Sequence, residues 1–131
     1  MVDDRITDGK RIAQLLASEL DGREDGELGT VAVTDADRDV EPTADGARAY
    51  DVRRTDTDES IARAFVHENR MRLAFSTGQE TVADAAESAG LRVQSSDDGP
   101  ATTDVLVESG AAVKRTTDVV EAVLESFTAD A

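Results

Sequence analysis

The only histidine of the chain, His67, stands in a stretch that also carries several arginines. A histidine acts as a general base when a hydroxyl or a substrate lies within reach and a second group orients its ring. The sequence supplies neither group beside His67, so we predict a histidine exposed in a turn. Arginines bind anions through the planar fork of the guanidinium. The residues that would form a binding surface here are Arg63, Phe65, His67, Arg70 and Arg72.

The positive charge of this stretch has two explanations. In the first, the arginines pair across strands with Asp51 and Glu68, and one of them stacks on Phe65. In the second, they form a surface for an anionic partner, or for the acidic face of a second copy of the chain. Arg53 and Arg54 would extend either arrangement from a neighbouring strand. We favour structural pairing and keep the binding surface as the alternative.

Three aspartates, Asp35, Asp37 and Asp39, have the spacing with which a calcium-binding loop begins. Such a loop also needs a glycine at its sixth position and a bidentate glutamate at its twelfth. The sequence has Val40 and Gly46 at those positions. We therefore predict a solvated acidic loop and no metal site.

A glycine-bearing stretch, Ser109–Arg115, follows an expected strand and precedes an expected helix, as phosphate-binding loops do. It matches neither GxxxxGK[ST] nor GxGxxG. The sequence also lacks GxSxG, HExxH and any cysteine, so it offers no familiar nucleophile or zinc site. We predict no catalytic residue and no cofactor, and we lean against an enzyme.

The elements that position the arginines are expected to be two strands joined by a tight turn. Met71, Leu73 and Phe75 alternate with polar or small residues, which is typical of a strand. A turn at 68–69 would pair His67 with Arg70. The face of this hairpin that packs in the core would be Ala62, Ala64, Val66, Met71, Leu73 and Phe75, and the arginines would lie on the other face. A helix over residues 58–69 remains an alternative, because apolar residues there also recur at helical spacing.

The rest of the chain is expected to form further helices and strands. Thr77 and Glu80 fit a capping box at the start of a helix that Gly90 would end. Both faces of the strand 103–108 are apolar, which predicts a central place in a sheet or one under the terminal helix. The other expected elements are helix 5–20, capped by Thr7 or Asp8, strands 28–34, 47–54 and 91–94, an acidic loop at 35–46, and a last helix from about Asp118.

This order, α-β-β-β-β-α-β-β-α, predicts an α+β fold with a largely antiparallel sheet and helices packed on it. We expect one domain over residues 1–131, since no stretch resembles a linker.

The composition is strongly acidic. The chain has 29 acidic and 14 basic residues, a net charge of −15, and lysine only at Lys10 and Lys114. Such surfaces suit a solvent of high salt, in which repulsion between carboxylates is screened. We therefore expect a halophilic, cytoplasmic protein. The overall negative charge repels nucleic acid, and no window is long and apolar enough for a membrane helix.

Over most of its length the chain resembles small acidic haloarchaeal proteins of unknown function. The stretches that carry the resemblance are RITDGKRIAQLLASELDGRE, DADRDVEPTADGARAYDV and VESGAAVKR. This resemblance implies no activity and no site residue. The order of elements is also loosely similar to that of secretion-chaperone-like α+β domains, which implies a homodimer that binds partners.

From these observations we expect a non-catalytic protein-interaction or homodimerising module, whose partner is a second copy or another protein. The alternative is a small anionic-ligand-binding or enzymatic domain that uses the arginine-rich hairpin face.

Overall fold

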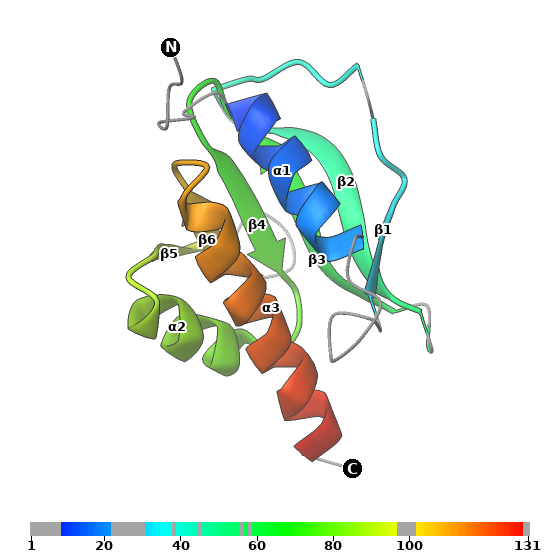
Figure 1. The fold of residues 1–131 in the computed structure, drawn as a ribbon, viewed down its shortest axis with the longest axis vertical. Coiled ribbons are helices and arrows are strands. Elements are labelled where there is room, and N and C mark those ends of the chain that lie inside the picture. The colour runs from blue at the N-terminus through cyan, green and yellow to red at the C-terminus, as the bar shows by residue number, and fades with distance from the viewer. Residues whose placement is uncertain are drawn as a thin grey trace.

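A computed structural model describes residues 9–21, 31–37, 39–44, 46–55, 57, 59–96 and 102–129 of the chain. Within these residues the elements follow the order expected from the sequence (Figure 1). They are α1 Gly9–Asp21, β1 Val31–Thr34, β2 Ala47–Arg54, β3 Ser60–Val66, β4 Met71–Phe75, α2 Gln79–Ser88, β5 Arg92–Ser96, β6 Thr102–Val107 and α3 Ala112–Ala129.

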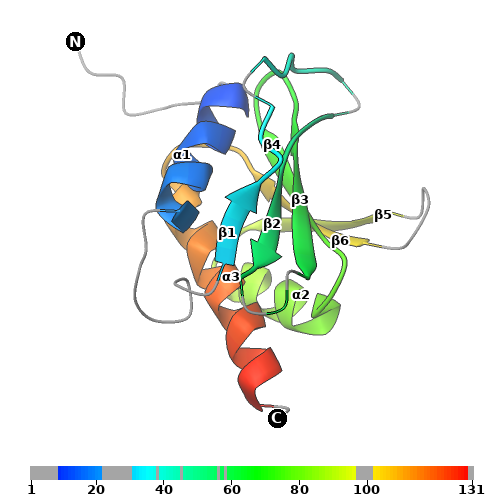
Figure 2. The same cartoon turned by 90° about the vertical axis from the view of Figure 1, so that its right-hand side faces the viewer.

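The strands form one antiparallel sheet in the order β1-β2-β3-β4-β6-β5. Helices α1 and α3 lie in front of this sheet in Figure 1, and in Figure 2 α1 lies to the left of the strands while α2 lies below β3. The predicted α+β class and antiparallel sheet are confirmed. The strand expected at 103–108 lies between β4 and β5, as its two apolar faces predicted.

The hairpin of β3 and β4 is confirmed in both its secondary structure and its register. Val66 pairs with Met71, and the His67 N–H donates to the Arg70 carbonyl over 2.9 Å. The competing helix at 58–69 is therefore wrong, because alternating burial across two paired strands outweighs helical spacing in a short apolar run. The predicted core face is 0–2 % exposed at every position, namely Ala62, Ala64, Val66, Met71, Leu73 and Phe75.

Helix α1 is held to the sheet by an apolar stripe and by one close backbone approach. Ile12, Leu16 and Leu20 are fully buried. A side chain at Gly9 would overlap the backbone of the β3–β4 turn, and the Gly9 N–H donates to the Glu68 carbonyl over 3.2 Å. The expected helix start at residue 5 and its caps lie outside the described residues.

Tyr50 on β2 also connects the sheet to α1. Its hydroxyl donates to the Ala13 carbonyl over 2.8 Å. Burial raises the pKa of the Tyr50 hydroxyl, because the phenolate is disfavoured away from water.

The capping box predicted for α2 is wrong. Gly78, not Thr77, precedes the helix, with φ +65° and no side-chain hydrogen bond at the cap. The α2 start packs so close to α3 that a side chain at Gly78 would come within 3.0 Å of Val123. The expected stop is confirmed. Gly90 has φ +77°, and the Leu91 N–H donates to the Ala86 carbonyl over 2.8 Å, as in a Schellman motif.

The last helix begins at Ala112, six residues before the start expected at Asp118, so Asp118 and Glu121 lie inside the helix and do not form a capping box at its start. The Ala112 N–H lies 3.3 Å from the Ser109 hydroxyl. Thr116 and Thr117 are buried because their hydroxyls donate to the carbonyls of the preceding turn. Because both hydroxyls form hydrogen bonds within the helix, the two threonines can be buried, and the buried face of α3 extends toward its first turn.

None of the helices in the described residues is long and apolar enough to cross a membrane.

Candidate functional site

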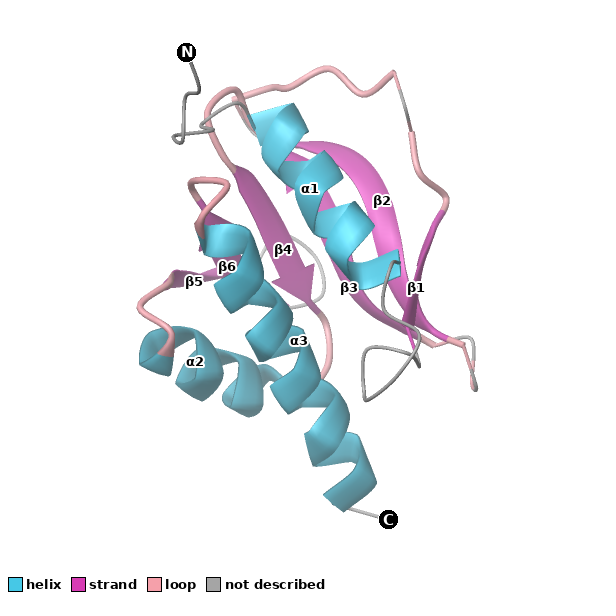
Figure 3. Cartoon of the chain, in the orientation of Figure 1, coloured by secondary structure: helices cyan, strands magenta, loops and turns pink. Residues whose placement is uncertain are grey.

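The sheet has a second face, opposite the helices, on which the arginines gather. We call it the open face (Figures 2 and 3). The antiparallel register sets two rows across it. One row runs Arg48, Phe65, Arg72, Leu106 and Arg92, and the other runs Asp51, Arg63, Ala74, Asp104 and Gln94. These two rows together place four arginines, one aromatic ring and two carboxylates on the open face of five strands.

The carboxylate of Asp51 is the centre of the first cluster on this face. It is almost fully buried, with a side chain 6 % exposed. The Nε atoms of Arg48 and Arg63 each lie 3.2 Å from its Oδ1, and Nη2 of Arg53 lies 3.8 Å from its Oδ2. The expected pairing of arginines with Asp51 across strands is confirmed, and Arg63 is the arginine on the neighbouring strand. Three guanidinium groups thus surround a single negative charge.

Arg48 and Arg63 extend from this cluster toward solvent. Their side chains are 36 % and 54 % exposed. Nη2 of Arg48 donates to the Asp35 carbonyl over 3.1 Å, which fixes its direction. Both arginines use Nε for Asp51, so the terminal edge of the exposed Arg63 fork faces away from that bond.

The second cluster is a buried ion pair between Arg72 and Asp104. Nη1 of Arg72 lies 3.2 Å from Oδ2 of Asp104, whose side chain is only 1 % exposed. The Thr102 hydroxyl donates to Oδ1 of Asp104 over 2.7 Å, so both carboxylate oxygens have partners. The guanidinium also lies 4.2 Å above the centre of the Phe65 ring, which confirms the predicted stacking.

His67 is buried, with 7 % exposure, so the prediction of an exposed turn histidine is wrong. Its Nδ1 lies 3.0 Å from the Ala44 carbonyl and must donate to it, which leaves Nε2 to accept from Nε of Arg72 over 3.5 Å. The reason is tertiary. The loop after β1 folds back over the turn, where the Thr43 N–H donates to the Val66 carbonyl over 3.3 Å.

The structure divides the five predicted binding residues. Phe65, His67 and Arg72 meet, and Arg63 belongs to the neighbouring Asp51 cluster. Arg70 joins neither, since it lies in the turn, and its buried Nε has no hydrogen-bond partner among the described residues. Arg54 also lies elsewhere, because it pairs with Val31 on the helix side of the sheet.

Sequence reasoning did not single out Arg48, Thr102 or Asp104. Asp104 carried a usable signal, since it lies two residues before Leu106 and directly before the apolar part of the strand, Val105–Val107. A charge inside a central strand needs a buried partner. Which residue supplies that partner depends on the pairing of β4 with β6, and this pairing is not visible in the sequence.

The aspartates of the expected acidic loop do not converge on one point. The Asp39 N–H donates to Oδ1 of Asp37 over 3.0 Å, and Asp35 has φ +53°. Over the part of the chain that the structure describes, no group of three or more metal-ligating side chains is found.

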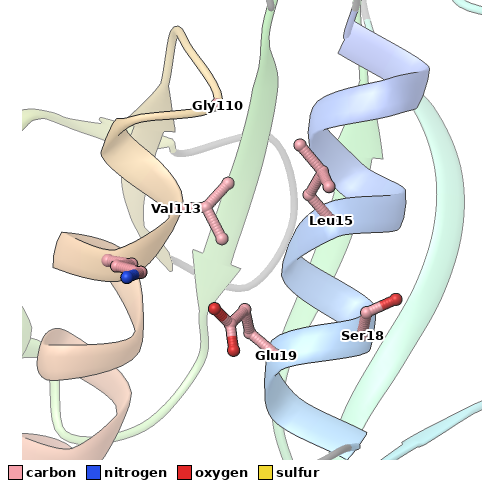
Figure 4. A pocket seen from close by; sticks show the side chains of 6 residues that line it. Leu15, Ser18, Glu19, Gly110 and Val113 are labelled. Carbon is pink, nitrogen blue, oxygen red and sulfur yellow. The ribbon is translucent and has the colours of Figure 1, made fainter. Parts of the chain in front are cut away.

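A hollow of about 270 Å³ lies between α1 and α3, away from both arginine clusters (Figure 4). Leu15 and Val113 point into it from the two helices, and Glu19 lies at one end. Ser18, Gly110 and Lys114 also line it, so part of the expected Gly-bearing connector borders this hollow.

A family model matches residues 1–131, which is the whole chain, and its description is "Family of unknown function (DUF7993)". The chain therefore belongs to this family. No curated protein matches the sequence, and no solved structure matches the fold.

Proposed function

We propose that this family member is a non-catalytic binding module whose open face takes an acidic segment of a partner protein. The observation that carries the proposal is the Asp51 cluster, in which three guanidinium groups share one carboxylate. Its one negative charge does not balance the two exposed guanidinium groups of Arg48 and Arg63, whose Nε atoms share Oδ1 of Asp51. The surplus stands on a chain whose net charge is −15, so the surface attracts carboxylates at a defined place.

The geometry suits a carboxylate side chain in two ways. Asp51 orients Arg48 and Arg63 before any ligand arrives, which lowers the entropy lost on binding. The exposed edge of the Arg63 fork can then donate two parallel hydrogen bonds to one carboxylate. The neighbouring Phe65 and Arg72 are fixed by the Asp104 ion pair and give this part of the surface a rigid wall.

The test is the binding of a fluorescein-labelled glutamate-rich peptide, measured by fluorescence anisotropy at the lowest KCl concentration at which circular dichroism shows a folded chain. We expect Arg63→Gln to weaken binding about five-fold, the equivalent of about 1 kcal/mol for an exposed charge pair. Arg92→Gln is the matched control, because Arg92 is exposed on the same face and pairs with Glu108 at 3.7 Å. Its binding should change less than about two-fold.

Two outcomes would contradict the proposal. One is an equal loss in the Arg63 and Arg92 variants, which would mean attraction by general charge alone. The other is peptide binding that free inorganic phosphate abolishes at millimolar concentration, which would favour the small-anion alternative.

An enzymatic role through His67 has less support. Both ring nitrogens of His67 have partners, at the Ala44 carbonyl and at Arg72. A general base needs a nitrogen that can reach substrate. In the proposed module, His67 instead connects the loop after β1 to Arg72 on the open face.

The proposal also includes a setting, the cytoplasm of a salt-adapted cell. Its support is the net charge of −15, the near absence of lysine and the resemblance to small haloarchaeal proteins.

A further inference from the structure

We propose that the outer edge of β5 is a self-association edge, at which the β5 strands of two copies of the chain pair antiparallel. This surface is separate from the Asp51 cluster and goes beyond the function proposed above. β5 ends the sheet opposite β1 (Figure 3). One edge of β5 therefore has no strand beside it in the described part of the chain, and alternate backbone N–H and C=O groups point outward there.

Apart from Arg92, the described edge lacks the usual features that prevent strands from pairing. Sheets protect such edges with proline, lysine, a bulge or an inward-pointing charge. The sequence of β5 is RVQSS, and its register with β6 is unbroken from Arg92 to Ser96. Residues 92–95 are all exposed. The strand thus offers an open template for another strand.

A second copy of the chain fits this edge better than an unrelated strand. An antiparallel pair of identical strands has two-fold symmetry, so each copy satisfies the groups that the other presents. Val93 is 36 % exposed, the large hydrophobic residue that stands out on the described surface. A pair centred on Val93 places the two Val93 side chains opposite each other and buries both.

Charge favours the same arrangement. Two chains that each carry −15 repel, and β5 itself has no acidic residue. Its one cation, Arg92, lies 3.7 Å from Glu108 of its own chain, so its charge is balanced before the copies meet. In the pair centred on Val93, Arg92 stands opposite the neutral Gln94. The β5 edge is therefore a place where two copies approach at low electrostatic cost.

Disulfide crosslinking tests the edge and its register, since the chain has no cysteine of its own. Val93→Cys should form a covalent dimer when diamide oxidises two thiols to one disulfide. Ser95→Cys is the matched control. In this register the two copies of residue 95 are four residues apart along the strands, about 13 Å, and should crosslink at least about ten-fold more slowly. Equal rates for the two variants would overturn the proposal.

Light scattering tests association without a covalent bond. At about 0.1 mM protein in about 1 M KCl, which suits a small interface between acidic chains, the unmodified chain should be a dimer. Val93→Lys should be a monomer, because the pair would then have to bury two ammonium groups in place of two apolar side chains. Ser88→Lys, on the exposed end of α2, should remain a dimer.

The unmodified chain as a monomer, or Val93→Lys as a dimer, would overturn the proposal. Circular dichroism of Val93→Lys should match that of the unmodified chain, since the side chain is exposed. Arg63→Gln should leave the dimer intact, so a failure of the acidic-peptide proposal and a failure of this one are distinguishable.

Discussion

At the scale of single residues, the open face depends on two buried carboxylates. As whole residues, Asp51 and Asp104 are only 4 % and 0 % exposed, although both lie on the side of the sheet away from the helices. Arginine side chains and Thr102 cover them and supply their hydrogen bonds. A buried carboxylate without such partners would be strongly destabilising. The arginines therefore have a structural role first, and the exposed parts of Arg48 and Arg63 can bind a ligand because that role fixes them in place.

A residue-scale prediction concerns Tyr50 at alkaline pH. Burial raises the pKa of its hydroxyl in the folded chain above the ordinary value near 10. The folded state then retains a proton that the unfolded state releases, so this contribution to stability is complete below about pH 10 and falls as the pH rises further.

Urea unfolding at about pH 9 and pH 11 measures this effect. The unmodified chain should lose more stability between the two than Tyr50→Phe, which cannot ionise. At the lower pH the variant should be about 1 kcal/mol less stable, because it loses the hydrogen bond to Ala13. An identical pH dependence in both proteins would contradict the prediction.

At the scale of elements, the β3–β4 hairpin organises its surroundings. Its turn receives the start of α1 at Gly9 and the loop after β1 at Thr43, while its two strands pair with β2 and β6. The hairpin therefore connects both halves of the sheet and one helix. It positions Arg63, Phe65 and Arg72 on the open face through the same alternation that buries Leu73 and Phe75.

The contact between α1 and this turn gives an element-scale prediction. Gly9→Ala would normally strengthen a helix by up to about 1 kcal/mol. Here the added carbon would overlap the carbonyl oxygens of His67 and Arg70, so the chain should instead be destabilised by about 1–3 kcal/mol.

Thermal unfolding should show this as a lower Tm. The matched control is Gln14→Ala, at an exposed position of the same helix, which should leave Tm unchanged or slightly raised. A Gly9→Ala chain as stable as the control would mean that α1 does not touch the turn.

At the scale of the whole molecule, the net charge is the main factor that opposes stability in this chain. A charge of −15 on 131 residues opposes compaction through mutual repulsion, and the two arginine clusters offset it only locally. Screening extends over about 10 Å at 0.1 M salt and about 3 Å at 1 M. The free energy of unfolding should therefore depend strongly on salt.

Far-UV circular dichroism and urea unfolding in dilute buffer and in about 1 M KCl test this dependence. We expect a clear gain in stability at high salt. Sucrose is the control, because it favours compact states without screening charge. Equal stability at the two salt concentrations, or an equal gain from sucrose, would argue against an adaptation to salt.

The sequence could predict what local patterns determine. The alternation of residues 61–75 was enough to predict the hairpin and its register, because the two-residue period of a strand assigns each side chain to a face. The same register places Arg72 opposite Phe65, on which it stacks. The Gly90 stop followed from the left-handed backbone that ends a helix. This sequence also contains none of the catalytic motifs considered above, so no reaction could be inferred from it.

Tertiary structure decided what depends on neighbours distant in sequence. The residue directly before α2 is Gly78 and not the expected Thr77, because the start of α2 packs directly against Val123 of α3. Helix α3 begins earlier than expected, and its first residues, Ala112 and Val113, pack in the buried core. His67 became buried because a loop more than twenty residues earlier in the chain covers it. Asp104 became the partner of Arg72 through strand pairing over 32 residues of sequence, and a pattern of nearest neighbours carries no information about contacts of that range.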